Sequence, residues 1–196
     1  MARASAGVRE FRKRFLAEMP HLPESAIKWD GENVDYFDTF MWPKKKTLAP
    51  TVAALIAHPA ARMLRHVHLR AMDVPDLAPI GALKNLRELY LWHCKTVGSL
   101  APLAKLGKLE RFDVTHSGVS DLKPLATCKK LWFVSIERTS VSSLRPLHRL
   151  PALWEVWCEK ANVSAKEAQA LRVAMGMRPR RKRPNGGMDD RDVYGA

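Results

Sequence analysis

Two pairs of histidines are the side chains whose type and spacing could support metal chemistry in this sequence. His66 and His68 alternate along an apolar stretch, and His93 and His116 hold equivalent places in two similar stretches. Zinc in proteins usually takes four ligands, with cysteine or carboxylate among them. Because the cysteines are better explained as core residues, the sequence predicts no metal site and no cofactor.

The three cysteines stand in apolar surroundings. Cys128 and Cys158 occupy positions where an apolar residue recurs, and Cys94 faces a turn. We predict that all three are buried free thiols, which behave as small hydrophobic residues. Their odd number, the lack of a signal peptide and the lack of an apolar run of membrane length favour a cytoplasmic protein with no membrane partner.

Motifs typical of enzymes are missing from the sequence. It has no P-loop, no G-x-S-x-G, no H-E-x-x-H and no paired carboxylates on a recognisable scaffold. The sequence therefore predicts no enzymatic activity and no catalytic residue.

The histidines and cysteines belong to a repeated segment, residues 64–163, which contains about five units of about 22 residues each. Two of the units read LRELYLWHCKTVGSLAPLAKLGK and LERFDVTHSGVSDLKPLATCKK. Each unit opens with a leucine and has apolar residues at its fourth, sixth and eleventh positions, except that one extra residue around Lys95 and Thr96 moves the last of these to the twelfth position in the first unit quoted. This alternation predicts a strand with one buried side. Prolines recur in the second half of each unit and exclude a continuous helix there, at Pro79, Pro102, Pro124 and Pro146.

This pattern resembles the leucine-rich repeat family, in particular the short repeats of internalins and of the phosphatase regulator SDS22. The resemblance implies an α/β solenoid, an arc with a short parallel sheet on its concave face and a 3₁₀ or extended turn in each unit. A looser similarity in the stretch LIAHPAARMLRHVHL is to bacterial intracellular repeat proteins. The family's asparagine at the ninth position is absent; the residues there are Met72, Cys94, Ser117, Thr139 and Ala161. Of these, cysteine, serine and threonine can still bond to the turn backbone.

Two segments precede the repeats. Residues 1–46 are basic and predict an amphipathic helix followed by a β-hairpin that turns at Asp30 and Gly31. Residues 47–63 predict a helix that is bent or divided at Pro59. We expect this helix to cover the exposed edge of the first repeat, because terminal repeats need a cap.

Two further segments follow the repeats. Residues 164–176 begin with a capping box, Ser164 and Glu167, and predict a cap helix over the last repeat. Residues 177–196 contain too few apolar side chains to form a core, so we predict a disordered basic tail.

The residues at the third, fifth and seventh positions of each unit point away from the core, onto the concave sheet. Aromatic residues gather among them: Tyr90, Trp92, Phe133 and Trp157, with Trp132 and Trp154 at the margin. The charged residues in these columns are mostly acidic. They comprise Arg70, Arg111, Glu88, Asp113, Glu137, Glu155 and Glu159.

Exposed aromatic residues on a mildly acidic ground suit a protein or peptide ligand and repel a phosphate backbone. We therefore predict a non-catalytic protein–protein interaction module. Its predicted partner-binding residues are Tyr90, Trp92, Phe133, Trp157, Trp132, Trp154, Glu137 and Arg111. The alternative is that the aromatic rings cover one another, or are covered by the hairpin, and leave no site.

The charge of the whole chain supports a second hypothesis, binding to nucleic acid or the ribosome. The formal net charge is +13 and the pI is near 10.0. Basic residues lie on the predicted outer side of the repeats and in the tail, where the cluster is Arg178, Arg180, Arg181, Lys182 and Arg183. The same tail could also fold back onto the acidic concave face. The sequence makes no prediction of oligomeric state.

Overall fold

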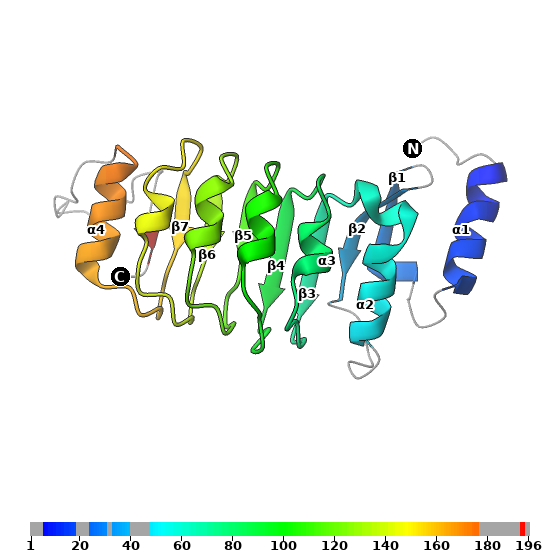
Figure 1. The fold of residues 1–196 in the computed structure, drawn as a ribbon, viewed down its shortest axis with the longest axis horizontal. Helices are drawn as coiled ribbons and strands as arrows, with labels where there is room; N and C mark the ends of the chain where they lie inside the picture. The colour runs from blue at the N-terminus through cyan, green and yellow to red at the C-terminus, as the bar shows by residue number, and fades with distance from the viewer. Residues whose placement is uncertain (1–5, 19–23, 31–32, 40–47, 177–192, 195–196) are drawn as a thin grey trace, which may run out of the picture.

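The repeat strands lie side by side in one sheet whose strand order follows the sequence (Figure 1). The computed structural model describes residues 6–18, 24–30, 33–39, 48–176 and 193–194. Neighbouring repeat strands are parallel, as the repeats predicted. They are β3 (His66–Arg70), β4 (Glu88–Trp92), β5 (Arg111–Asp113), β6 (Phe133–Ser135) and β7 (Glu155–Trp157).

Short helices form a second layer on one face of the sheet (Figure 1). Each has a proline at its first or second position, where the missing N–H of proline costs no hydrogen bond. They are the α-helix α3 (Ala78–Gly81) and the 3₁₀ helices η4 (Ala101–Lys105), η5 (Lys123–Thr127) and η6 (Arg145–Leu147). The structure thus confirms a solenoid of alternating strands and short turns.

The core lies between these two layers. Leu89, Leu91, Phe112 and Val134 are fully buried, whereas the strand residues between them face the other side of the sheet. Burial of one such side chain contributes about 1.5–3 kcal/mol. All three cysteines are buried free thiols, as predicted.

The turn after each repeat strand uses an uncommon backbone conformation. The residue at the eighth position of every unit has a positive φ, although none of the five is glycine; they are Ala71, His93, His116, Arg138 and Lys160. In two units, the side chain of the following residue bonds to the turn. The Thr139 hydroxyl donates to the Ile136 carbonyl at 2.6 Å, and the Ser117 hydroxyl accepts from the Val119 amide at 3.3 Å. These side chains replace the asparagine of the family pattern.

The N-terminal hairpin continues the sheet at its edge. Strand β1 (Ile27–Asp30) follows the 3₁₀ helix η1 (Glu24–Ala26) and pairs antiparallel with β2 (Asn33–Asp38), and β2 pairs parallel with β3. Helix α1 (Ala6–Glu18) lies beyond the hairpin at the end of the molecule (Figure 1).

Helix α2 (Leu48–Ala57) and the 3₁₀ helix η3 (Pro59–Met63) precede the first repeat. The helical conformation is interrupted between them at His58. The Nδ1 atom of His58 accepts a hydrogen bond from the Ala60 amide at 3.1 Å and caps η3. Phe15 of α1 packs edge-on against His58 and Trp29, with ring centroids 4.7 and 5.1 Å away. Residues 40–47, between the hairpin and α2, lie outside the described residues.

Helix α4 (Ala165–Ala174) lies at the opposite end of the solenoid (Figure 1). The Ser164 hydroxyl accepts from the Glu167 amide at 3.2 Å, which is one half of the predicted capping box. The Glu167 carboxylate instead accepts from the Ser143 hydroxyl at 3.1 Å. Of the tail predicted to be disordered, the structure describes only β8 (Val193–Tyr194), which pairs parallel with β7. The cluster at 178–183 lies outside the described residues.

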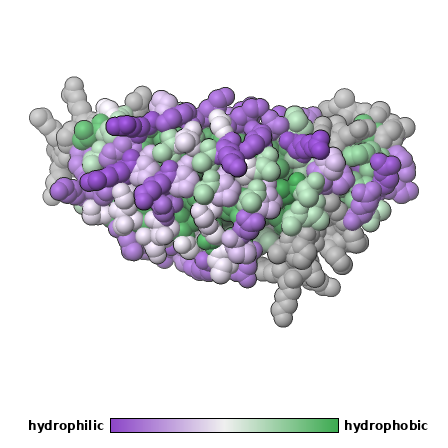
Figure 2. Space-filling view, in the orientation of Figure 1, coloured by the Kyte–Doolittle hydropathy of each residue, from purple (hydrophilic) through white to green (hydrophobic). Residues whose placement is uncertain are grey.

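The face that carries the short helices is mixed in character. Figure 2 shows hydrophilic side chains spread over it, with hydrophobic surface between them near α2 and α3. Within the ranges given above, no helix combines the length and the apolar character needed to cross a membrane.

Candidate interaction surface on the concave sheet

The strand registers place the predicted columns of side chains on the concave sheet. His66, Glu88, Arg111, Phe133 and Glu155 are consecutive register partners, which is the predicted third-position column. The fifth-position column is likewise His68, Tyr90, Asp113, Ser135 and Trp157. The hairpin adds a residue to each column, because Tyr36 pairs with His66 and Asp38 with His68. The sequence analysis did not predict that Tyr36 and Asp38 lie on the concave sheet. The alternation of apolar and polar residues in VDYFD was the signal that could have shown it.

A first aromatic group lies on β3 and β4. The rings of Tyr90 and Trp92 are stacked, with centroids 5.3 Å apart and an angle of 8° between the planes. The imidazole of His68 covers the tyrosine, 4.2 Å away. Tyr90 is consequently only 7% exposed, so its predicted exposure is wrong, and its role in binding stays a prediction. Trp92 remains half-buried.

A second aromatic group lies on β6 and β7. Phe133 is 5% exposed because Trp157 and Trp132 pack against it, with ring centroids 5.5 and 5.9 Å away. Its predicted exposure is therefore also wrong. Neighbouring strands are only ~4.8 Å apart, so large rings in adjacent columns screen one another from water.

Arg111 connects the two aromatic groups. The central carbon of its guanidinium lies 5.0 Å from the ring centroid of Phe133, 5.2 Å from that of Trp132 and 5.7 Å from that of Tyr90. Such cation–π contacts contribute about 0.5–2 kcal/mol each, more when the cation is desolvated. Arg111 therefore holds the aromatic groups together as well as carrying charge.

Two tryptophans of the last repeat remain open to solvent. Trp154 is 41% exposed and Trp157 is 38% exposed, and the Trp157 Nε1 donates to the Glu155 carboxylate at 2.7 Å. The hairpin pairs with β3, and strands β4, β5 and β6 separate β3 from β7 in the sheet, so the hairpin lies far from β7 (Figure 1). The alternative of mutual burial thus applies to Tyr90 and Phe133, whereas the tryptophans stay accessible.

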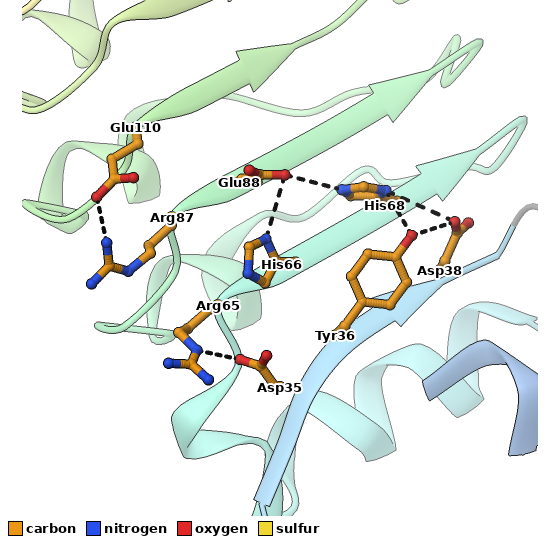
Figure 3. A network of polar contacts seen from close by, with 9 residues as sticks. All are labelled: Asp35, Tyr36, Asp38, Arg65, His66, His68, Arg87, Glu88 and Glu110. Atoms are coloured by element: carbon orange, nitrogen blue, oxygen red, sulfur yellow. Dashed lines mark hydrogen bonds and ion pairs between the residues drawn. The ribbon is translucent and has the colours of Figure 1, made fainter. Parts of the chain in front are cut away.

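A polar network occupies the hairpin end of the concave sheet (Figure 3). The Tyr36 hydroxyl donates to Asp38 at 2.7 Å and lies 3.1 Å from the His68 Nδ1. One oxygen of Glu88 lies 3.7 Å from the His68 Nε2 and 3.4 Å from the His66 Nδ1. These contacts, His68 foremost, lower the pKa of Glu88 to about 2.

Carboxylates gather toward the middle of the same sheet. Asp113 is buried and its carboxylate accepts a hydrogen bond from the Thr115 amide at 2.9 Å. Burial, followed by the charges of Glu159 and Asp113, raises the pKa of the Glu137 carboxyl. Because like charges raise the pKa of Glu137, a cation bound next to Glu137 would stabilise its ionised carboxylate.

The histidine pairs have different surroundings. His66 and His68 contact carboxylates, whereas His93 and His116 pack against each other with ring centroids 4.6 Å apart. Across the described ranges, no three histidine, cysteine or acidic side chains are grouped so that they could hold a metal ion.

Comparison with solved structures identifies the class of this repeat fold. An internalin (inlF) from Listeria monocytogenes superposes with a TM-score of 0.51 at 20% identity, covering 63% of this chain and 35% of the internalin chain. Internalin C2 (inlC2) from the same species superposes with a TM-score of 0.50 at 28% identity, covering 59% of this chain and 48% of its own. The aligned part of each internalin is thus less than half of its length. No protein-family model and no curated protein matches the sequence.

The repeat motif, the stacked strands and these likenesses agree with one another. The chain has the leucine-rich repeat fold. The structures it is similar to include internalins, and the likeness at 20% identity concerns the fold alone.

Proposed function

We propose that this protein is a non-catalytic binding module whose concave sheet binds an extended segment of a protein partner. The observation that carries the proposal is Trp157, which stays 38% exposed in the fifth-position column beside a supporting aromatic group. Tryptophan, tyrosine and arginine are the residues most enriched at binding hot spots. Leucine-rich repeat folds are generally recognition scaffolds, which is an argument from fold class and adds to this one.

The surroundings of the tryptophans suggest the chemistry of the partner. Trp92 and Trp157 offer flat apolar surface. Glu137 and Glu159 stand at the seventh position of their units, as Trp92 does, and Trp157 stands in the neighbouring fifth-position column. The raised pKa of Glu137 favours a cationic neighbour. A peptide with an apolar or aromatic side chain and a nearby lysine or arginine fits both features.

Peptide display tests the proposal without a known partner. Random peptides are selected on the intact protein, and the dissociation constants of the best ones are measured by calorimetry. Trp157→Ala is expected to weaken binding by about 2 kcal/mol, roughly 30-fold, which is typical of a hot spot. Glu137→Gln is expected to weaken only those peptides that carry a basic side chain.

Met63→Ala is the matched control, because Met63 is a large exposed apolar residue, 47% exposed, on η3 outside the concave sheet. Peptides that bind Trp92→Ala and Trp157→Ala proteins as tightly as the wild type would refute the proposed surface. A loss confined to Met63→Ala would move the site to the other layer.

The lysines on the outer side support the second candidate, binding to nucleic acid. The turns and short helices of successive repeats carry exposed basic residues, namely Lys84, Lys105, Lys108, Lys123, Lys129, Lys130, Arg145 and Arg149. Such binding would weaken steeply between 50 and 200 mM salt, by about 10³-fold for six phosphate contacts. This candidate would be refuted if the protein bound neither RNA nor DNA. It would also be refuted if the binding were unaffected by salt and by the double substitution Lys129→Glu and Lys130→Glu.

A further inference from the structure

Four basic or protonatable side chains gather at one rim of the concave sheet, where the strands of successive repeats end. They are His93, Lys95, His116 and Arg138, which we name the rim cluster. The rings of His93 and His116 have centroids 4.6 Å apart at an angle of 32°. The Lys95 ammonium lies 3.4 Å from the His116 Nδ1.

The backbone holds the rim cluster in a fixed arrangement. His93, His116 and Arg138 have φ values of 57°, 60° and 54°, in the left-handed region. Their amides donate to carbonyls of the next repeat: His93 to Thr115 at 3.0 Å and His116 to Glu137 at 2.9 Å. Left-handed backbone costs a residue with a side chain about 1–2 kcal/mol. The packed repeats thus hold these three side chains in one column at the rim.

The rim cluster carries more positive than negative charge, although the Glu137 carboxylate interacts with the charge of Arg138. Within the part of the chain that the structure describes, none of its four members forms an ion pair with a carboxylate. In contrast, Lys160 occupies the same column and contacts the Glu159 carboxylate at 3.5 Å. Desolvation lowers the pKa of His116, and Lys95, His93 and Arg138 lower it further.

The proton positions also favour an anion over a cation. An ammonium group has no lone pair, so Lys95 is the donor and the His116 Nδ1 is the acceptor. The proton of the neutral imidazole is therefore on Nε2, where it can be donated to a ligand. A metal ion would be repelled by Lys95 and Arg138, and a zinc ion would find no thiolate or carboxylate here.

We propose that the rim cluster binds a tetrahedral oxyanion of the phosphate class. Lys95 and Arg138 supply positive charge, and His93 and His116 supply N–H donors from two adjacent repeats. Charge-assisted hydrogen bonds of this kind are the strong ones in proteins, and lysine and arginine are the usual phosphate ligands. This site is separate from the tryptophan surface and extends the proposed function.

The phosphate can be free or can be carried by a phosphorylated side chain of a protein. A polynucleotide fits less well, because its many charges would meet Glu137 and Glu159 on the adjoining sheet. A single phosphoryl group brings less negative charge toward those carboxylates. We therefore favour a phosphomonoester on a protein over nucleic acid as the biological source.

Histidine NMR tests the site directly. Inorganic phosphate is added to the intact protein while sodium chloride keeps the ionic strength constant, and the imidazole C–H signals are followed. Saturable shifts are expected for His93 and His116 but not for His66 and His68. Lys95→Gln and His116→Asn are expected to weaken binding about tenfold or more, as the loss of a charge-assisted bond implies. Asparagine tolerates the left-handed backbone, so His116→Asn keeps the fold.

Lys160→Gln is the matched control and is expected to leave phosphate binding unchanged, because Lys160 is paired with Glu159. Shifts that follow ionic strength alone, that affect all histidines equally, or that persist in Lys95→Gln would overturn the proposal. Neither result depends on whether peptides bind the tryptophans.

Calorimetry then distinguishes the sources with a phosphoserine peptide, its unphosphorylated form and free phosphate. Tighter binding of the phosphopeptide than of free phosphate assigns the site to a protein ligand, and equal binding assigns it to the free ion. Tighter binding of a DNA or RNA oligonucleotide that Lys95→Gln weakens would overturn the phosphomonoester assignment.

Discussion

The indole of Trp92 lies parallel to the ring of Tyr90, with an interplanar angle of 8° and centroids 5.3 Å apart. Both residues are on β4 and face the same side of the sheet, because side chains alternate along a strand. Tyr90 is buried and Trp92 is half-buried. The tyrosine therefore acts as the base on which an accessible tryptophan is held.

Trp92→Ala is expected to destabilise the protein as well as to weaken ligand binding. The substitution removes a stacked pair, which typically contributes about 0.5–1.5 kcal/mol beyond the area that it buries, and it exposes Tyr90. Trp92→Phe should retain most of the contribution of the stacked pair to the free energy of unfolding. Urea unfolding of the three proteins checks the prediction, and equal midpoints for the alanine and phenylalanine variants would contradict it.

Gly98→Ala is expected to destabilise the stack of repeats. A Cβ atom at Gly98 would lie 1.9 Å from the Pro75 carbonyl oxygen in the preceding repeat. The backbones must separate to admit it, and overpacking of this kind costs about 1–3 kcal/mol. Gly107→Ala is the control, because a Cβ there meets nothing within 4 Å. Thermal unfolding compares the two, and similar midpoints would show that the repeats are not packed this closely.

Glu88 is expected to contribute stability that acid removes. Its pKa is about 2 in the folded protein against an ordinary value of 4.5, chiefly because of His68. A carboxyl group with a lowered folded-state pKa stabilises the fold above the unfolded-state pKa. This contribution is lost as the pH falls from about 4.5 toward 2. The difference in unfolding free energy between wild type and Glu88→Gln should therefore shrink over that range in a series of urea titrations.

Glu137→Gln provides the opposite case. The pKa of Glu137 is raised in the folded protein by burial and by the neighbouring carboxylates Glu159 and Asp113. Ionisation of Glu137 therefore destabilises the fold as the pH rises through its folded-state pKa. Glu137→Gln should be at least as stable as the wild type at pH 7, whereas Glu88→Gln should be less stable. Identical pH profiles for the two variants would contradict both assignments.

The three thiols are expected to be unreactive in the folded protein. Burial raises the pKa of each, to about 11 for Cys158, and the thiolate is the reactive form. A thiol reagent at pH 7.5 should label Cys94, Cys128 and Cys158 only after denaturant is added. Rapid labelling of any of them in the native protein would show that its repeat is open to solvent.

Much of the fold could be predicted because the repeats supply the same information several times. The leucines of successive units predicted which side of each strand is buried, and the register of His66 with Glu88 and Arg111 follows from the repeat length. A two-residue alternation leaves only one choice of face once the core is known.

The exposure of individual rings could not be predicted from the same pattern. Tyr90 and Phe133 point to the predicted face, but their exposure depends on side chains from neighbouring strands, such as His68 and Trp157. The left-handed backbone at His93 and Arg138 gave no sequence signal either, since glycine is the usual mark of positive φ. Strand β8 is too short for any periodicity.

Oxidative footprinting of the complex with a selected peptide tests the central claim most directly. Trp157 and Met63 are both exposed in the free protein, at 38% and 47%, and both are readily oxidised, so mass spectrometry can compare their rates with and without the peptide. The concave surface proposed here predicts strong protection of Trp157 and none of Met63. Protection of Met63 with an unchanged rate at Trp157 would contradict it.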